Sequence, residues 1–97
     1  MAMKNSQIKA LIEKNGRQSE ILVCTEELSE LIQAISKCER NRLGDDYSKN
    51  DLDNLYEEIA DVQITIKLLK QLFRLDPNRI QAWQRRKEQR TIKRYDL

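Results

Sequence analysis

Two short acidic segments of this chain have the residue types and the spacing of a metal-binding site. Residues 26–30 read EELSE and residues 57–61 read EEIAD, so each segment has two adjacent glutamates and a third acid three residues after the second glutamate. Clustered carboxylates without histidine suit a hard divalent cation, Mg²⁺ or Mn²⁺, which keeps coordination positions open for water and phosphate oxygens. The two segments therefore point to a cation that serves phosphate chemistry.

Four helices are expected to position these acids. The 97 residues include only two glycines and one proline, and 35% of them are charged, which is typical of an all-α protein. We predict helices over residues 5–15, 17–42, 51–75 and 77–93. Gly16 is expected to end the first helix, Ser48 to cap the third, and Asp76 with Pro77 to begin the fourth. We expect a single domain over residues 1–97, and its apolar content is low enough that homo-oligomerisation should complete the bundle.

Helical periodicity indicates where the acids point. Each of the two long helices has one apolar stripe. The stripes comprise Ile21, Cys24, Leu28, Leu31 and Ile35 on the second helix, and Leu52, Leu55, Ile59, Val62, Ile66 and Phe73 on the third. Glu27, Glu30, Glu58 and Asp61 lie on matching flanks of these stripes, and Glu26 and Glu57 lie further round toward solvent. Because helices joined by a short loop pack antiparallel, we expect the four flanking acids to converge at the margin of the core.

The composition narrows the chemistry of this site. The chain has no histidine, which excludes a di-iron bundle of the Glu-x-x-His type and argues against zinc. Its two cysteines lie 14 positions apart on one predicted helix, too far apart to pair with each other. We expect a reduced, cytoplasmic protein, with no signal peptide and no membrane partner.

Charge is distributed unevenly along the chain. Residues 20–61 contain 12 acids and 4 bases, whereas residues 77–97 contain 7 bases and 2 acids. Lys87, Arg90 and Arg94 recur at spacings of three and four, so they share one face of the fourth predicted helix. That face is suited to phosphate oxygens, and the acidic region is suited to cations.

These features together resemble the all-α nucleoside triphosphate pyrophosphohydrolases of the MazG type. Their EExxE…ExxD signature is similar to residues 26–30 followed by residues 58–61, and the likeness extends over about residues 18–94. The resemblance implies a four-helix-bundle-like MazG-type fold and a homodimer or homotetramer. It also implies Mg²⁺-dependent hydrolysis of a nucleoside triphosphate between the α- and β-phosphates, which yields the monophosphate and pyrophosphate.

The resemblance assigns roles residue by residue. Glu27, Glu30, Glu58 and Asp61 would be the metal ligands, with Mg²⁺ expected and Mn²⁺ as the other candidate. Glu26 matches the first acid of the signature and is the candidate catalytic base, although Glu57 is placed equivalently.

A third motif of the family is only partly present. MazG-type enzymes have an Asn-x-Lys-x-x-Arg-Arg stretch, which matches this chain at Lys87 and Arg90 but departs from it at Arg85 and Thr91. Lys87, Arg90 and Arg94 are therefore the candidate substrate-binding residues, and the preferred nucleotide is left open.

Two other functions stay open from the sequence. One is a non-enzymatic helical homo-oligomeric module whose basic C-terminal helix binds an acidic partner, although we do not expect nucleic acid. That function explains the basic helix but not the paired acids. The other is a family member that binds a nucleotide without hydrolysing it.

Overall fold

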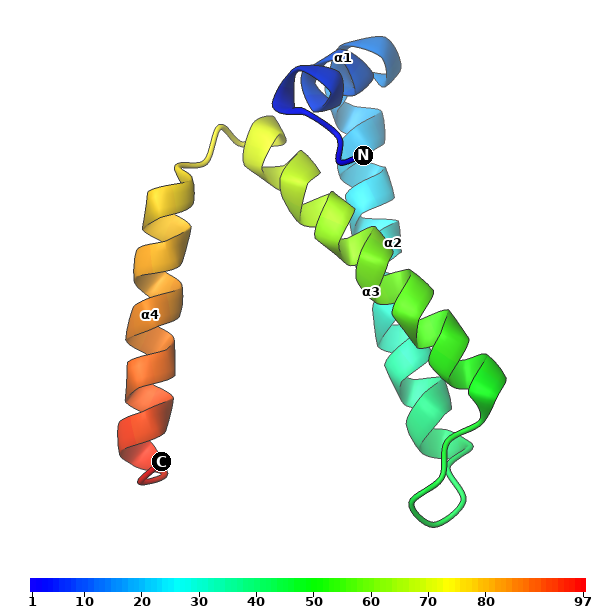
Figure 1. Cartoon of the computed structure of the whole chain (residues 1–97). Helices are drawn as coiled ribbons and strands as arrows, with labels where there is room; N and C mark the ends of the chain where they lie inside the picture. The colour runs from blue at the N-terminus through cyan, green and yellow to red at the C-terminus, as the bar shows by residue number, and fades with distance from the viewer.

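The chain folds entirely into α-helices. The computed structural model describes all residues from 1 to 97, and it has four helices and no β-strand. They are α1 (Asn5–Asn15), α2 (Arg17–Arg40), α3 (Lys49–Leu72) and α4 (Pro77–Arg94). Figure 1 shows α2 and α3 side by side, α1 across one end of this pair, and α4 extending alone on the other side of an open V. None of the helices combines the length and the apolar character needed to cross a bilayer.

The predicted helix boundaries are confirmed where a side chain or a glycine sets them. Gly16, with φ of 90°, separates α1 from α2. The Ser48 hydroxyl accepts a hydrogen bond from the Asp51 N–H at the start of α3. The Asp76 carboxylate accepts one from the Asn78 N–H, and Pro77 opens α4. Both caps satisfy N–H groups that have no partner inside the helix.

The predicted ends of the two long helices are wrong by two or three residues. Helix α2 ends at Arg40 instead of residue 42, and α3 runs from Lys49 to Leu72 instead of from 51 to 75. The end of α3 is set by Arg74, which has φ of 50° and lets the Leu75 N–H donate to the Lys70 carbonyl. This backbone closure resembles a Schellman motif, which usually has glycine at the left-handed position, and the arginine at residue 74 therefore did not indicate a helix end.

A short connection fixes α2 and α3 as an antiparallel hairpin. Leu43 and Asp46 exchange two backbone hydrogen bonds of 2.9 and 3.0 Å around Gly44, whose φ of 64° favours glycine. The Cys38 thiol then donates to the Asp51 carbonyl at 3.3 Å, and the Asn41 amide donates to the Asp51 carboxylate at 3.1 Å. These bonds set the register between the two helices.

The line of contact between α2 and α3, which we call the seam, follows the predicted apolar stripes only in part. Its α2 side comprises Glu20, Cys24, Glu27, Leu31, Ala34 and Cys38, and its α3 side includes Asp51, Glu58, Asp61, Thr65, Leu68 and Leu72. Cys24, Ala34 and Thr65 are each only 1% exposed, and such small side chains let two helices approach closely. The prediction that the apolar stripes form the core is therefore wrong in part.

Several residues of the predicted stripes are exposed instead. Leu28, Ile35, Ile59, Ile66 and Phe73 are between 38% and 53% exposed, and we call them the apolar face. Each directly follows a seam residue, and consecutive residues turn by about 100° around a helix. Because the two helices run antiparallel, the residue that follows each seam residue points to the same side of the hairpin on both helices. The apolar face is therefore continuous across α2 and α3. Periodicity identifies an apolar side of a helix but not which neighbour covers it.

Helix α1 closes the open end of the hairpin. Ile8 is 1% exposed and packs with Cys24, Leu68 and Leu72 in the main apolar cluster. The Asn15 amide donates to the buried Glu20 carboxylate at 2.8 Å, which holds the end of α1 against α2. Burial and a hydrogen bond therefore both secure α1.

Helix α4 is not part of this packing. It buries no residue, and the packing between helices lies among α1, α2 and α3. A single chain is therefore not a closed four-helix bundle, although the all-α class is as predicted.

Replacing Leu68 with alanine should destabilise the fold. Leu68 is 5% exposed inside the main cluster, and removing such a side chain leaves a cavity that typically costs about 2–5 kcal/mol. Urea denaturation followed by circular dichroism measures the free energy of unfolding. The neighbouring Lys67→Ala change is the control, because Lys67 is exposed, and equal losses for the two variants would contradict this core.

Candidate metal centre

The hairpin register brings the two acidic segments to the same level. Glu30 lies eight residues before Cys38, and Glu58 lies seven residues after Asp51, the residue that Cys38 contacts. By the same count, Glu27 lies opposite Asp61. Because both helices rise by about 1.5 Å per residue, nearly equal separations from one fixed contact place the side chains face to face.

Four carboxylates therefore meet on the seam. One oxygen from each of Glu27, Glu30, Glu58 and Asp61 lies within 4.8 Å of all the others. The predicted convergence of these four residues is confirmed, but their position is different in part: Glu27, Glu58 and Asp61 lie on the line of helix contact, and Glu30 lies at its exposed edge. Glu27, Glu58 and Asp61 are half-buried, and Glu30 is exposed.

Nothing in the chain compensates these charges. The only ion pair joins Arg42 to Glu39, so none of the four acids has a basic partner. One carboxylate oxygen of Glu27 and one of Glu58 are shielded from solvent and accept no hydrogen bond. Buried acceptors normally have a partner, and two carboxylates about 4 Å apart repel by roughly 4 kcal/mol at an effective dielectric of 20. The arrangement is therefore costly without a cation or protons.

The pKa values reflect this crowding. Desolvation by burial, followed by the charges of Glu30, Asp61 and Glu58, raises the pKa of Glu27 above its usual range. Desolvation and the charges of Glu30, Asp61 and Glu57 also raise the pKa of Glu58. Oxygen atoms alone, with two orphaned acceptors, are the donor set that Mg²⁺ and Mn²⁺ prefer. The four residues fit such an ion.

Cys24, one turn before Glu27 on the seam, does not extend this donor set. Burial and then the charges of Glu20 and Glu27 raise the pKa of its thiol. A thiol that keeps its proton is a poor metal ligand and a poor nucleophile. Cys24 therefore serves packing, and both cysteines are free as expected.

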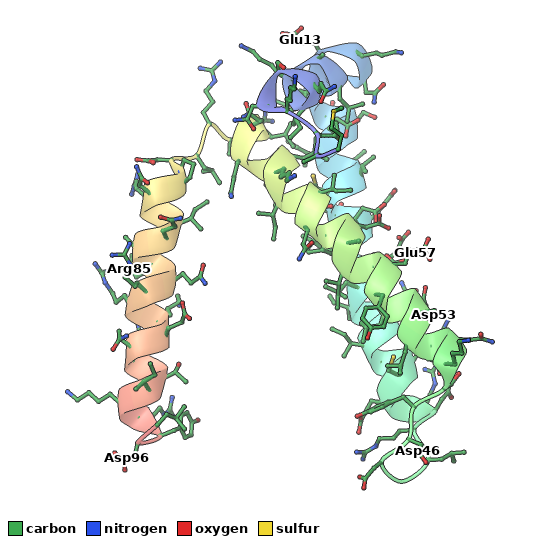
Figure 2. The ribbon with its side chains drawn as sticks, in the orientation of Figure 1. Glu13, Asp46, Asp53, Glu57, Arg85 and Asp96 are labelled. Atoms are coloured by element: carbon green, nitrogen blue, oxygen red, sulfur yellow. The ribbon has the colours of Figure 1, made fainter.

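Two further acids lie beside the cluster of four and are not part of it. Glu26 and Glu57 directly precede seam residues and are exposed, as predicted. Figure 2 shows Glu57 directed outward from α3. We call the side of the hairpin that bears Glu26, Glu30, Glu57 and Asp61 the acidic side, and it lies opposite the apolar face.

The basic residues do not reach the acids within one chain. Lys87, Arg90 and Arg94 lie on α4, on the far side of the open V. Their placement on one helix is confirmed, but the structure of a single chain does not bring them to the carboxylates. Sequence reasoning had no signal for this separation, since it depends on the direction in which α4 leaves α3.

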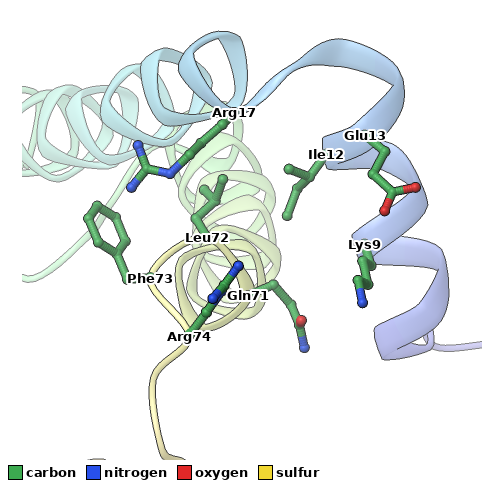
Figure 3. A pocket seen from close by; sticks show the side chains of 8 residues that line it. All are labelled: Lys9, Ile12, Glu13, Arg17, Gln71, Leu72, Phe73 and Arg74. Carbon is green, nitrogen blue, oxygen red and sulfur yellow. The ribbon is translucent and has the colours of Figure 1, made fainter.

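A large cavity of the chain lies away from the acids. It measures about 730 Å³ and lies where α1, the start of α2 and the end of α3 meet (Figure 3). It is lined by Lys9, Ile12, Glu13, Arg17, Gln71, Leu72, Phe73 and Arg74. Within it the Arg17 guanidinium stacks 5.1 Å from the centre of the Phe73 ring. The acids form an open edge of the hairpin, not a pocket, so a second surface is needed to enclose a substrate there.

Comparison of the chain with protein-family models, with curated proteins and with solved structures finds no match.

The stability of the metal-free protein should fall as the pH rises from about 4.5 toward neutrality. Glu27 and Glu58 have raised pKa values in the folded state, so over this range the folded state binds more protons than the unfolded chain. Each of these groups then makes folding less favourable once it ionises. Thermal melts at several pH values, with a chelator present, measure this trend. A melting temperature that rises steadily up to neutral pH would contradict it.

Replacing Glu58 with glutamine should raise the melting temperature of the metal-free protein at pH 7 and remove the stabilisation by Mg²⁺. The amide relieves the repulsion but supplies no charge for the cation. Differential scanning fluorimetry with and without Mg²⁺ tests both effects. The matched control is Asp53→Asn, an exposed acid on the same helix and outside the cluster. It should leave the response to Mg²⁺ unchanged.

Proposed function

We propose that this protein is a Mg²⁺-dependent nucleoside triphosphate pyrophosphohydrolase of the MazG type. The observation that carries the proposal is the meeting of four uncompensated carboxylates on one helix seam, where two oxygens have no hydrogen-bond partner. Structural acids in a helical protein would more commonly be solvated or paired with lysine and arginine. The matching acidic segments, to which the MazG signature is similar, support the same conclusion.

The acidic and basic residues of the chain would have different roles in this reaction. Glu27, Glu30, Glu58 and Asp61 would hold the cation, which would supply positive charge to phosphate oxygens and lower the pKa of a coordinated water. Glu26 and Glu57 are exposed beside the site and free to accept a proton from the attacking water. Lys87, Arg90 and Arg94 supply positive charge for the triphosphate once α4 faces an acidic cluster.

The proposal includes self-association. Only 8 of the 97 residues are buried, which is a small core for a chain that must offset its conformational entropy. The apolar face is continuous along the hairpin and no other helix of the chain packs over it; only its Phe73 end is contacted, by the Arg17 guanidinium. Two hairpins packed through this face would form a four-helix bundle.

Pyrophosphate release from a panel of nucleoside and deoxynucleoside triphosphates with Mg²⁺ tests the activity. Glu58→Gln should lower turnover more than about 100-fold, because even groups outside a metal's ligand shell contribute about 10–100-fold. Asp53→Asn should keep nearly full activity. Calorimetry separates the remaining possibilities: Mg²⁺-dependent nucleotide binding without turnover would indicate a binding protein, and neither binding nor turnover would indicate an interaction module.

Replacing Ile66 with aspartate should dissociate the oligomer. Ile66 lies on the apolar face, and a charge there would be desolvated in a bundle interface. Sedimentation velocity should show a lower mass for this variant with helical content retained. Lys67→Asp is the control, since Lys67 is exposed on the same helix and is turned about 100° away from Ile66. A monomeric wild-type protein would contradict self-association.

A further inference from the structure

The joint between α3 and α4 holds α4 in one direction. On one side of the joint the Leu75 N–H donates to the Lys70 carbonyl at 2.9 Å, and Arg74 has a left-handed backbone. On the other side Asp76 caps α4 and precedes Pro77, which restricts the backbone of Asp76 to an extended conformation. The angle between α4 and the hairpin is therefore set by the backbone conformation of residues 74–77.

The V opens over the apolar face. A cavity of about 540 Å³ at its apex is lined both by Phe73, which belongs to the apolar face, and by Ile80 and Trp83 of α4. Figure 2 places Arg85 on the outer side of α4, and helical phase turns Ile80, Trp83, Lys87, Arg90 and Arg94 toward the opposite, inner side. The inner side of α4 is thus apolar near the joint and cationic toward the C-terminus.

This pattern does not suit closure of α4 onto its own hairpin. The hairpin presents its apolar face to the V, so closure would place the cationic half of α4 against apolar residues. Burying those charges without partners is unfavourable. The acids lie on the other side of the same hairpin.

The acidic side of a second copy matches the inner side of α4 in order and in spacing. On the acidic side of α3, Glu57 comes first along the chain, Asp61 lies one turn later, and the exposed apolar residue Ile64 lies one turn after that. An antiparallel α4 with Trp83 beside Ile64 brings Lys87 near the level of Asp61. Arg90 then meets Glu57, since both pairs are seven residues apart.

We propose that the hairpin of a second copy fills the V, so that α4 of each subunit lies on the acidic side of its partner. The two apolar faces pack against each other, and α4 passes over the outer side of the partner's hairpin. Two-fold symmetry repeats the contact. Each acidic cluster is then covered by the partner's α4, whose Lys87 and Arg90 complete the site. The role of these two residues toward phosphate depends on the proposed function, but the placement of α4 does not.

Zero-length crosslinking with a water-soluble carbodiimide tests this placement without substrate or metal. The reagent joins a lysine amine to a carboxylate in contact with it, and Lys87 should couple to acids of residues 57–61 or 26–30. Unlabelled and ¹⁵N-labelled full-length protein are mixed in urea, refolded together and crosslinked. If α4 is exchanged, about half of the Lys87-linked peptides should combine one labelled and one unlabelled partner.

Two variants identify the reacting amine. Lys87→Arg keeps the charge but removes the amine, so the mixed peptides should disappear, whereas Lys93→Arg, further round α4, should retain them. If every linked pair is either fully labelled or fully unlabelled, α4 contacts the acids of its own chain, and the proposal is overturned. Absence of any Lys87 link to these acids would also overturn it. Loss of turnover with mixed peptides present would refute the proposed reaction and leave the exchange intact.

Discussion

Repulsion between four carboxylates on a helix seam is the constraint on which the rest of this structure depends. Glu27, Glu30, Glu58 and Asp61 meet where a two-helix hairpin would ordinarily bury apolar side chains. The seam accommodates them because Cys24, Ala34 and Thr65 pack closely on either side of the cluster, and because α1 adds Ile8 to the apolar cluster at the open end. Stability is concentrated at one end of the hairpin, and the charges are concentrated in its middle.

This division leaves the chain with surfaces that one copy cannot satisfy. No helix of the chain covers the apolar face, α4 buries no residue, and the four acids have no basic partner. Other parts of the same sequence could satisfy each of these surfaces: a second apolar face could cover the first, and the basic residues of α4 could pair with the acids. The proposed assembly of identical chains would account for these three observations with one arrangement, which is simpler than a different partner for each.

Much of this fold was predictable from local signals. Ser48 and Asp76 cap helices, Gly16 separates two of them, and the matching phases of the acidic segments predicted their convergence. The identity of the seam was not predictable, because Leu28 and Ile59 have the same apolar character whether they face a neighbouring helix or a second chain. The direction of α4 was not predictable either, since it depends on Arg74 adopting a backbone conformation that favours glycine.

The hairpin register also determines where this chain can change in length. The contact between Cys38 and Asp51 sets the level of both acidic segments along the hairpin. A residue inserted into residues 42–47 lies outside that contact and leaves the helix register unchanged. A residue inserted into either helix between this contact and the acids would rotate the two acids of that helix by about 100° away from the two acids of the other helix. We therefore expect insertions and deletions to be tolerated in the connecting loop, whereas a change in the length of residues 31–38 or 51–57 should separate the acids.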